Sequence, residues 1–427
     1  MAGLTSGELE DVLAAVTPQE METPGEILYV TRHQQPSFLA TLLSAWDRDG
    51  RDIGPGLSYE LEQLRRRSAF YQELRGRLAR EWRDPVSMKG LEVADRYPEP
   101  LLRYMNDLDY WVPEQERLWG IAGWLIDDGW AVHSATFLRH EGELHVIVSM
   151  RRFPEDPYAL SYGVEIGTPA LLGDRVGVPT RVRLPAACAE PIAKNFVAML
   201  MERFEQPFRA RDLVDAAVLL GDAPSAAVKS CALAVHELGL WPEYAELVAL
   251  LERTPLEVPR LPGDLRTLSL AAQARRRATA AGALRQPFSF ALMSLQNRMM
   301  TGASGMLSRR AWGLAERRLD ARAALKAGLL LFALPVDTGR RAPRATLYER
   351  DGTLWADTPI GSFVLVHGEE IDEEALEGAR ATGDVGDTEG ARAARAAGDR
   401  EDTEDAEDAE DAEGARTAGG AGREGEE

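Results

Sequence analysis

Two aspartates, Asp107 and Asp109, stand two residues apart inside an apolar run and form the clearest chemical pattern in the sequence. Side chains alternate between the two faces of a β-strand, so residues i and i+2 point the same way. If this run is a strand, both carboxylates project from one face, while Leu108 and Tyr110 face the other. Mg²⁺ is a hard cation that prefers carboxylate oxygens and substrate phosphates. The pair therefore predicts a Mg²⁺ site on one face of a strand.

Basic residues precede this acid pair in the sequence. Residues 85–90 predict a short buried strand that ends at Lys89-Gly90, and the proline-rich connection over residues 97–103 brings Arg103 toward the acids. A lysine or arginine beside a Mg²⁺ site is suited to neutralising phosphate charge. Two alternatives remain open, namely Lys89 as a solvent-facing loop residue and Arg103 as a salt-bridge partner of Asp107 or Asp109.

A family resemblance rests on these same residues. The chain resembles an uncharacterised nucleotidyltransferase family of the nucleotidyltransferase-like superfamily at Lys89-Gly90, Tyr97-Pro98, Arg103, Asp107-Leu-Asp109 and Gly129-Trp130. The matched core covers residues 70–170, and residues 208–215 are similar to a later, arginine-rich helix of the family that ends in aspartate. Proteins of this family often occur near peptide natural-product pathways.

The resemblance implies an α+β fold with a nucleotidyltransferase-like mixed β-sheet core and Mg²⁺ as cofactor. It implies transfer of a nucleotidyl group from an NTP to a small-molecule, peptide or protein acceptor in natural-product biosynthesis. Asp107 and Asp109 would then be catalytic and metal-binding, while Lys89, Gly90 and Arg103 would contact the nucleotide. Minimal nucleotidyltransferases carry Gly-Ser where this chain has Lys89-Gly90. That difference favours an alternative, a non-catalytic nucleotidyltransferase-fold scaffold or binding protein in a biosynthetic complex.

A third carboxylate is expected in such a site, and two residues are candidates. Glu165 lies in a predicted strand between two glycines, and Glu143 lies in a Glu-Leu-His segment that is similar to the acid-x-His pattern of the family's third strand. We favour Glu165, because it closes the third strand of a predicted meander and precedes a loop. Its alternative interpretation is an edge-strand glutamate exposed to water. The predicted catalytic and metal-binding set is therefore Asp107, Asp109 and Glu165.

Hydrophobic periodicity and turn signals predict the elements that position these residues. A long amphipathic helix is expected over residues 58–83, and its arginines are interpreted as a solvated face because glutamates are interspersed with them. The core should contain a helix at residues 114–127 and three strands at residues 130–139, 143–152 and 159–167. Residues 264–333 are expected to be helical, and a β-hairpin should follow over residues 344–367.

The domain organisation follows from these elements and from composition. In chain order we predict a helical N-terminal region, the nucleotidyltransferase-like core, a helical bundle, a C-terminal helical region with a β-hairpin, and a disordered acidic tail, at residues 1–84, 85–185, 186–254, 255–367 and 368–427. From Glu369 onward the chain holds 22 acidic and six basic residues, so this segment carries −16 of the formal net charge of −20. Such a segment cannot bury enough apolar surface to offset the entropy of ordering.

The rest of the chain is only mildly acidic, and no long basic block is present, so no nucleic-acid partner is expected. The N-terminus lacks the pattern of a secretory signal, and the longest apolar segment, residues 327–336, is too short to span a bilayer. We therefore expect a cytoplasmic protein without a membrane partner. The two cysteines, Cys188 and Cys231, are expected to be buried free thiols, and the six histidines show no spacing suited to zinc.

Overall fold

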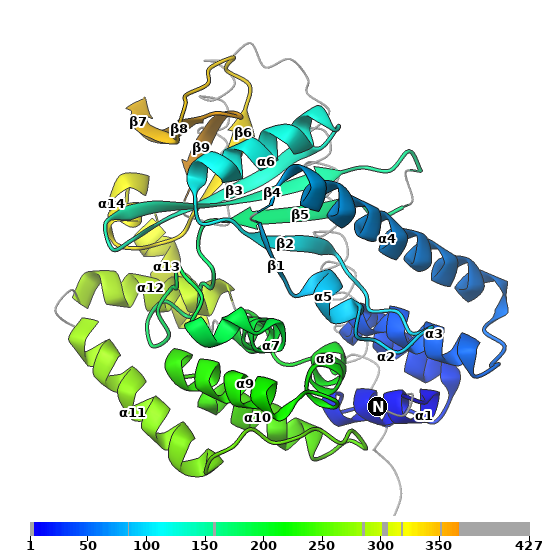
Figure 1. Ribbon diagram of the computed structural model, residues 1–427. Helices are drawn as coiled ribbons and strands as arrows, with labels where there is room; N and C mark the ends of the chain where they lie inside the picture. The colour runs from blue at the N-terminus through cyan, green and yellow to red at the C-terminus, as the bar shows by residue number, and fades with distance from the viewer. Residues whose placement is uncertain are drawn as a thin grey trace, which may run out of the picture.

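One sheet organises the part of the chain that can be described (Figure 1). The computed structural model describes residues 4–83, 85–156, 159–283, 287–300, 306–316, 319–350 and 352–366. Within these ranges, helices surround a mixed sheet of nine strands. The prediction of a mixed sheet with helical additions on both sides of it in the sequence is confirmed. The predicted acidic tail lies outside the described residues.

The N-terminal region is helical, as predicted. It comprises α1 (Ser6–Val16), α2 (Pro24–Gln34), the 3₁₀-helix η1 (Pro36–Phe38), α3 (Leu39–Arg48) and α4 (Gly54–Glu81). Thr5 and Thr23 cap α1 and α2, each in a reciprocal capping box with a glutamate three residues later, which satisfies backbone donors that helix starts leave free. Helix α4 is long enough to join two hydrophobic cores: Leu61 packs with the helical core, whereas Leu74 and Leu78 pack with the core of the sheet.

The sheet runs in the order β1-β2-β5-β4-β3-β6-β9-β8-β7. Its strands are β1 (Val86–Met88), β2 (Asp107–Trp111), β3 (Ala131–His140), β4 (Glu143–Arg152), β5 (Tyr162–Gly167), β6 (Leu331–Val336), β7 (Thr346–Arg350), β8 (Thr353–Thr358) and β9 (Gly361–Val366). The neighbours β2 and β5 are parallel, and the other neighbouring pairs are antiparallel. A parallel pair requires a long connection, which here contains α6, β3 and β4.

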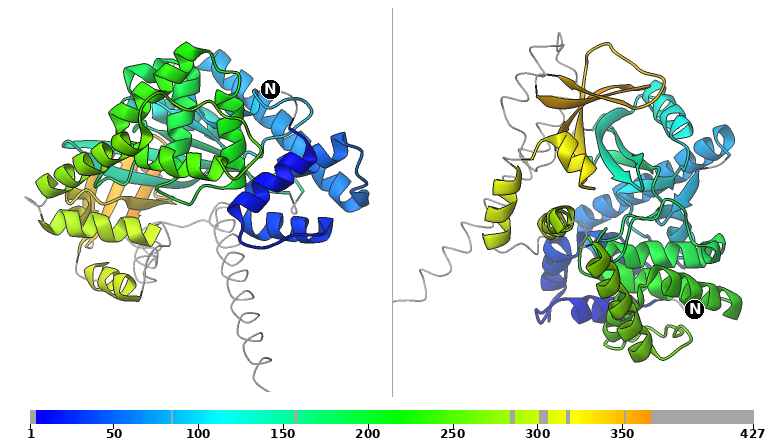
Figure 2. Two further views of the ribbon diagram at one scale, coloured as in Figure 1. Left: turned by 90° about the horizontal axis from the view of Figure 1, so that it is seen from below. Right: turned by 90° about the vertical axis from the view of Figure 1, so that its left-hand side faces the viewer.

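The two faces of the sheet differ around β2, β4 and β5. One face is apolar, because Leu108, Val148 and Ile166 are buried there with the stripe of helix α6 (Gln115–Asp127). That stripe includes Leu118, Ile121 and Leu125. The opposite face carries the polar residues of the alternation and lies toward a bundle of helices (Figure 2). The polar face is therefore where the predicted site residues meet other elements.

Residues 186–254 are mainly helical, as predicted. They contain η2 (Ala186–Ala189), α7 (Pro191–Glu202), α8 (Ala210–Leu220), α9 (Ser225–Leu238) and α10 (Trp241–Leu251). Their apolar side chains form one core with those of α1, α2 and α3. Helix α7 contacts the sheet at β1. Cys188 and Cys231 are buried free thiols within this bundle, as expected.

The C-terminal region corrects one prediction. Its helices are α11 (Leu265–Ala283), α12 (Pro287–Met300), α13 (Met306–Glu316) and α14 (Ala321–Lys326), but residues 331–336 form strand β6 rather than the end of a helix. Gly328, with φ of +85°, ends α14, and the apolar run after it pairs with β3. The predicted hairpin forms β7 and β8, and β9 then joins β8 to β6. The hairpin thus extends the main sheet, although Asp351 of its predicted turn lies outside the described residues.

Among the described residues, the search for a membrane-crossing helix found none of sufficient length and apolar character.

Candidate functional site

Strand β2 presents the predicted acid pair on one face. Leu108 and Tyr110 are buried in the sheet core, and Asp107 and Asp109 are half-buried on the opposite face. This alternation is the one expected from the i, i+2 spacing. Both carboxylates therefore face the bundle side of the sheet, where α7 lies.

The parallel neighbour β5 brings Glu165 to the same place. Asp109 and Glu165 are register partners in the β2–β5 pair, and Glu165 is in turn opposite Ser149 of β4. Adjacent strands lie about 4.8 Å apart, and partners in register project from the same face. The structure therefore brings together the three acids Asp107, Asp109 and Glu165 on two neighbouring strands.

Glu143 does not lie near this group. It begins β4 beside the β3–β4 turn, where it is exposed and pairs with His140. The position of β4 that lies opposite Glu165 is Ser149, which is roughly 20 Å further along the strand at the usual rise per residue. Of the two candidates for a third carboxylate, the structure places Glu165 beside the aspartates.

A cleft lies between this face of the sheet and the C-terminal end of α7. Its polar lining consists of Lys89, Asp109, Glu165, Glu202 and Glu205, and its apolar lining includes Trp111, Ile147, Met201 and the residues from Pro169 to Leu172. A larger cavity, of about 530 Å³, lies within the bundle between α10 and residues 254–260. We place the candidate site at the smaller cleft, because Asp109, Glu165 and Lys89 line it.

Crowding of the carboxylates perturbs their protonation. Enclosure by the protein, together with the charge of Asp107, raises the pKa of Asp109 well above its usual 3.8, and Lys89 opposes this change. The same two causes raise the pKa of Glu165 to about 7. The Glu165 side chain is exposed on the side that faces the cleft, while protein surrounds it on its other sides. Partial loss of contact with water is therefore the larger of the two causes that raise the pKa of Glu165. Such repulsion is relieved when a cation binds.

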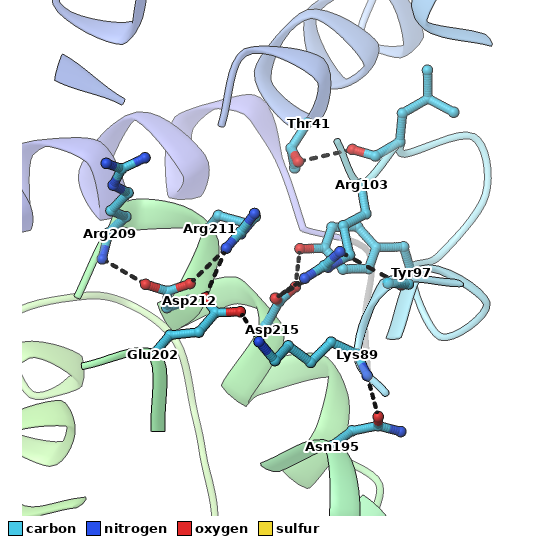
Figure 3. Close-up of polar contacts among 12 residues, drawn as sticks. Thr41, Lys89, Tyr97, Arg103, Asn195, Glu202, Arg209, Arg211, Asp212 and Asp215 are labelled. Atoms are coloured by element: carbon cyan, nitrogen blue, oxygen red, sulfur yellow. Dashed lines mark hydrogen bonds and ion pairs between the residues drawn. The ribbon is translucent and has the colours of Figure 1, made fainter. Parts of the chain in front are cut away.

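Lys89 follows β1 and reaches across the cleft. Its ammonium group forms an ion pair of 2.7 Å with Glu202 of α7, and its backbone N–H donates a hydrogen bond of 2.7 Å to Asn195 (Figure 3). Burial disfavours the charged form, but Glu202 and Asp109 outweigh it and raise the pKa of Lys89. The alternative interpretation of Lys89 as a solvent-facing loop residue is therefore wrong: it is a half-buried cation of the cleft.

The Lys89-Gly90 turn is conformationally demanding. Lys89 has φ of +55° and Gly90 has φ of +47°, and a positive φ is uncommon for a residue with a Cβ. Side chains of α7 hold the turn: the Asn195 amide oxygen accepts from the N–H of Lys89, while its NH₂ group and the Lys194 ammonium both donate to Glu92 at 2.8 Å. Gly90 meets the need for positive φ without strain and is buried, so it serves the turn and does not itself reach into the cleft.

Ion pairs continue from Glu202 into α8. The Glu202 carboxylate also lies 3.1 Å from the guanidinium of Arg211. Burial would raise the pKa of Glu202, but the charges of Lys89 and Arg211 outweigh this effect and lower the pKa to about 2. Arg211 in turn lies 3.5 Å from the buried Asp212, whose pKa burial raises to about 6. The segment 208–215, singled out by the resemblance, therefore packs directly behind the Lys89–Glu202 pair (Figure 3).

Arg103 is not a partner of the acid pair, which corrects one of the alternatives for it. Its guanidinium donates to Asp215 of α8 at 2.8 and 2.9 Å, and the Tyr97 hydroxyl donates to the same carboxylate at 2.7 Å. All three side chains are buried. Arg103 does not line the cleft, so it holds the 97–103 connection against α8 (Figure 3).

Arg67 and Tyr71 of α4 fix the starts of the two acid-bearing strands. The Arg67 guanidinium donates to the carbonyls of Met105 and Asn106 before β2, and to those of Leu160 and Ser161 before β5. The Tyr71 hydroxyl donates to the Asn106 carbonyl and accepts from the N–H of Gly163 at 2.9 Å. Arg67 is buried, so the expectation that the arginines of residues 58–83 form a solvated face is wrong at this position.

Tyr71→Phe is expected to lower the free energy of unfolding by about 1–2 kcal/mol. The substitution leaves the N–H of Gly163 without its buried acceptor, and a lost buried hydrogen bond costs an amount of this order. Tyr162→Phe is the matched control, since no hydrogen bond joins the Tyr162 hydroxyl to the described residues. Urea denaturation of both variants measures the difference. Equal losses would show that Tyr71 does not join the strands through its hydroxyl.

The residue types of the cleft fit Mg²⁺ better than a softer metal. Asp107, Asp109 and Glu165 offer carboxylate oxygens, and their mutual repulsion gives a cation a favourable place to bind. In the part of the chain that the structure describes, no group of three or more acidic, histidine or cysteine side chains is arranged closely enough to hold a metal ion. The donor set fits Mg²⁺ in the kind of ligand atom that it offers and in its shared face, but the three carboxylates would have to move closer together to hold one ion.

Comparison of the chain with protein-family models, with curated proteins and with solved structures finds no match. The resemblance to a nucleotidyltransferase family therefore stays a prediction.

Three charged residues on this side of the sheet were not singled out from the sequence: Glu202 and Glu205, which line the cleft, and Arg151, which lies on the same face of the sheet as the acids. Glu202 ends α7 and Glu205 lies in the turn after it. The sequence marked this segment only as part of a bundle, and the i, i+3 spacing of the two glutamates was the available signal. Arg151 lies on β4, where the alternation of buried Val148 and Met150 with Ser149 and Arg151 places it on the polar face. Extending the strand alternation from Asp107 to β4 would have found it.

Proposed function

We propose that this protein is a Mg²⁺-dependent nucleotidyltransferase, which moves a nucleotidyl group from an NTP to a hydroxyl or amine of a small-molecule, peptide or protein acceptor. The observation that carries the proposal is the parallel register of β2 and β5. It sets Glu165 beside Asp109 and leaves Asp107 on the same face. Three carboxylates on one face of a sheet, opposite a lysine, suit a reaction at a polyphosphate.

The reaction forms a bond from the acceptor oxygen or nitrogen to the α-phosphorus of the nucleotide and breaks the bond from that phosphorus to its bridging oxygen, so that pyrophosphate leaves. Asp107, Asp109 and Glu165 would hold Mg²⁺, which when bound neutralises phosphate charge. Lys89 lies across the cleft from Asp109 and supplies a further positive charge. Catalysis of this kind depends mainly on positioning and charge, which a rigid pair of strands provides.

A second function has specific support. Lys89 is already bound to Glu202, and Arg103 is bound to Asp215, so two of the cations predicted to contact a nucleotide have acidic partners in the protein. That arrangement favours a non-catalytic scaffold or binding protein. The two functions differ in one property: the nucleotidyltransferase should be stabilised against heat by an NTP together with Mg²⁺, and the scaffold should not.

Glu165→Gln is expected to remove most of the thermal stabilisation by Mg²⁺ and an NTP, because an amide is a much poorer ligand for Mg²⁺ than a carboxylate. Glu143→Gln is the control and should keep the wild-type stabilisation, since Glu143 lies at the far end of β4. Thermal unfolding of both variants with ATP, GTP, CTP or UTP, with and without Mg²⁺, measures the stabilisation. The opposite ranking would move the site to Glu143. The absence of any stabilisation of the wild type would favour the scaffold.

A further inference from the structure

The cations that surround the acid pair differ in whether a carboxylate already neutralises them. Lys89 lies 2.7 Å from Glu202, Arg103 lies 2.8 Å from Asp215, and Arg211 lies 3.1 Å from Glu202. A cation held in this way gains less from a substrate phosphate, because the existing ion pair must first be broken. The cation that a polyphosphate would meet at the lowest cost should therefore lie elsewhere.

Arg151 is a cation on the same face of the sheet as the acids. In the register of the sheet it lies opposite Gly163 of β5, which lies opposite Asp107 of β2. The next row contains Ser149, Glu165 and Asp109. Arg151 and Asp107 are thus two strands apart in one row, with a glycine between them.

Gly163 makes room for the Arg151 side chain. A Cβ at position 163 would overlap the guanidinium of Arg151 and would lie 2.9 Å from the Cβ of Asp107. The guanidinium therefore passes over β5 at a glycine, where no side chain blocks it, and extends toward β2, which carries Asp107. A longer side chain at this position would push it away from Asp107.

The Arg151 side chain has no acidic partner among the residues that the structure describes, since neither a hydrogen bond nor an ion pair joins its guanidinium to them. It is half-buried. These observations describe a cation that is oriented toward the carboxylates and is still available to an anion.

We propose that Arg151 binds a phosphate oxygen of the substrate's polyphosphate beside Asp107. The proposal rests on the proposed function, since it names the residue that receives the anionic part of an NTP. The guanidinium presents a planar fork of N–H donors that matches two phosphate oxygens, and it stays charged at any physiological pH. Gly163 acts as the positioning residue for this fork, because it sets the path of the Arg151 side chain.

Calorimetric titration with inorganic tripolyphosphate in the presence of Mg²⁺ tests this assignment without requiring a nucleoside or an acceptor. Arg151→Met should weaken tripolyphosphate binding by about 10- to 100-fold, the usual effect of losing hydrogen bonds to a charged group. Arg151→Lys keeps the charge but not the fork and should fall between wild type and Arg151→Met. Arg152→Met is the matched control and should bind like wild type, because Arg152 pairs with Asp128 next to α6. Thermal unfolding confirms that each variant is folded.

Each outcome decides the proposal. Wild-type affinity in Arg151→Met, or no binding of tripolyphosphate to the wild type, would overturn the assignment of Arg151. Equal losses in Arg151→Met and Arg152→Met would also overturn it, because the effect would then be one of general charge. Binding of tripolyphosphate that depends on Arg151, combined with no binding of any NTP, would support the anion site and reject the proposed nucleotidyltransferase. If instead the wild type binds an NTP and Arg151→Met binds it equally well, the proposed nucleotidyltransferase is supported and the assignment of Arg151 is rejected.

Discussion

Asp107→Asn and Asp109→Asn are each expected to weaken Mg²⁺-dependent nucleotide binding at least about 100-fold, since even groups behind the ligands of a metal change its affinity by 10- to 100-fold. An amide oxygen is neutral and binds Mg²⁺ far more weakly than a carboxylate does. Asp11→Asn, an exposed change on α1, is the control and should leave binding unchanged. Calorimetric titration of each Mg²⁺–nucleotide complex measures the loss. Undiminished binding in both β2 variants would reject the site.

Asp107→Asn should not lower the stability of the metal-free protein. Burial, together with the charge of Asp107, raises the pKa of both Asp109 and Glu165, so between pH 4.5 and about 7 the folded state binds more protons than the unfolded state. Stability that arises in this way is present at low pH and is lost as the pH rises through that window. Asp107→Asn removes a common cause of the raised pKa values. At pH 8 the variant should therefore be at least as stable as the wild type, and a lower melting temperature there would show that Asp107 has a structural partner.

The largest effect on stability is expected from Asp215→Ala. This change leaves the Arg103 guanidinium buried without its carboxylate and removes the acceptor of the Tyr97 hydroxyl. Removing one partner of a buried ion pair typically costs about 3–5 kcal/mol. Asp95→Ala is the matched control: it breaks a pair with Arg75 in which the Arg75 and Asp95 side chains are 33% and 42% exposed, so its cost should stay below about 1 kcal/mol. Urea denaturation measures both, and a loss in Asp215→Ala as small as that in the control would contradict this account of the buried pair.

The sequence was informative wherever local periodicity decided the structure. The i, i+2 spacing of Asp107 and Asp109 led directly to their shared face, because strand alternation needs only the immediate neighbours. The preference for Glu165 over Glu143 depended on the expectation that Glu165 closes the third strand of the meander. The parallel pairing of that strand, β5, with β2 places Glu165 beside the two aspartates.

Contacts between distant segments were beyond such reasoning. Arg103 and Asp215 are 112 residues apart in sequence, and Lys89 meets Glu202 only because α7 packs against β1. No local pattern distinguishes a glutamate that binds a lysine from one in water. Arg67 shows the same limit in a different way: it belongs to a charged run whose other members are exposed or half-buried, yet it is the member that faces the strand starts.

Strand β6 was missed for a different reason. The run from Leu329 to Leu334 is continuously apolar, and a short apolar run fits a buried strand and a buried helix equally well. Gly328 before the run and Pro335 directly after it were the signals against a helix. The position of β6 next to β3 then determines that β7, β8 and β9 continue the main sheet.

The most direct test of the central claim is a crystal structure of the protein grown with Mn²⁺, in place of Mg²⁺, and a non-hydrolysable NTP analogue. The proposed function predicts an anomalous scattering peak within coordination distance of the carboxylates of Asp107, Asp109 and Glu165, with the polyphosphate of the analogue in the cleft beside Lys89. A nucleotide bound in the cavity between α10 and residues 254–260, or a cleft that holds neither Mn²⁺ nor the analogue, would contradict it.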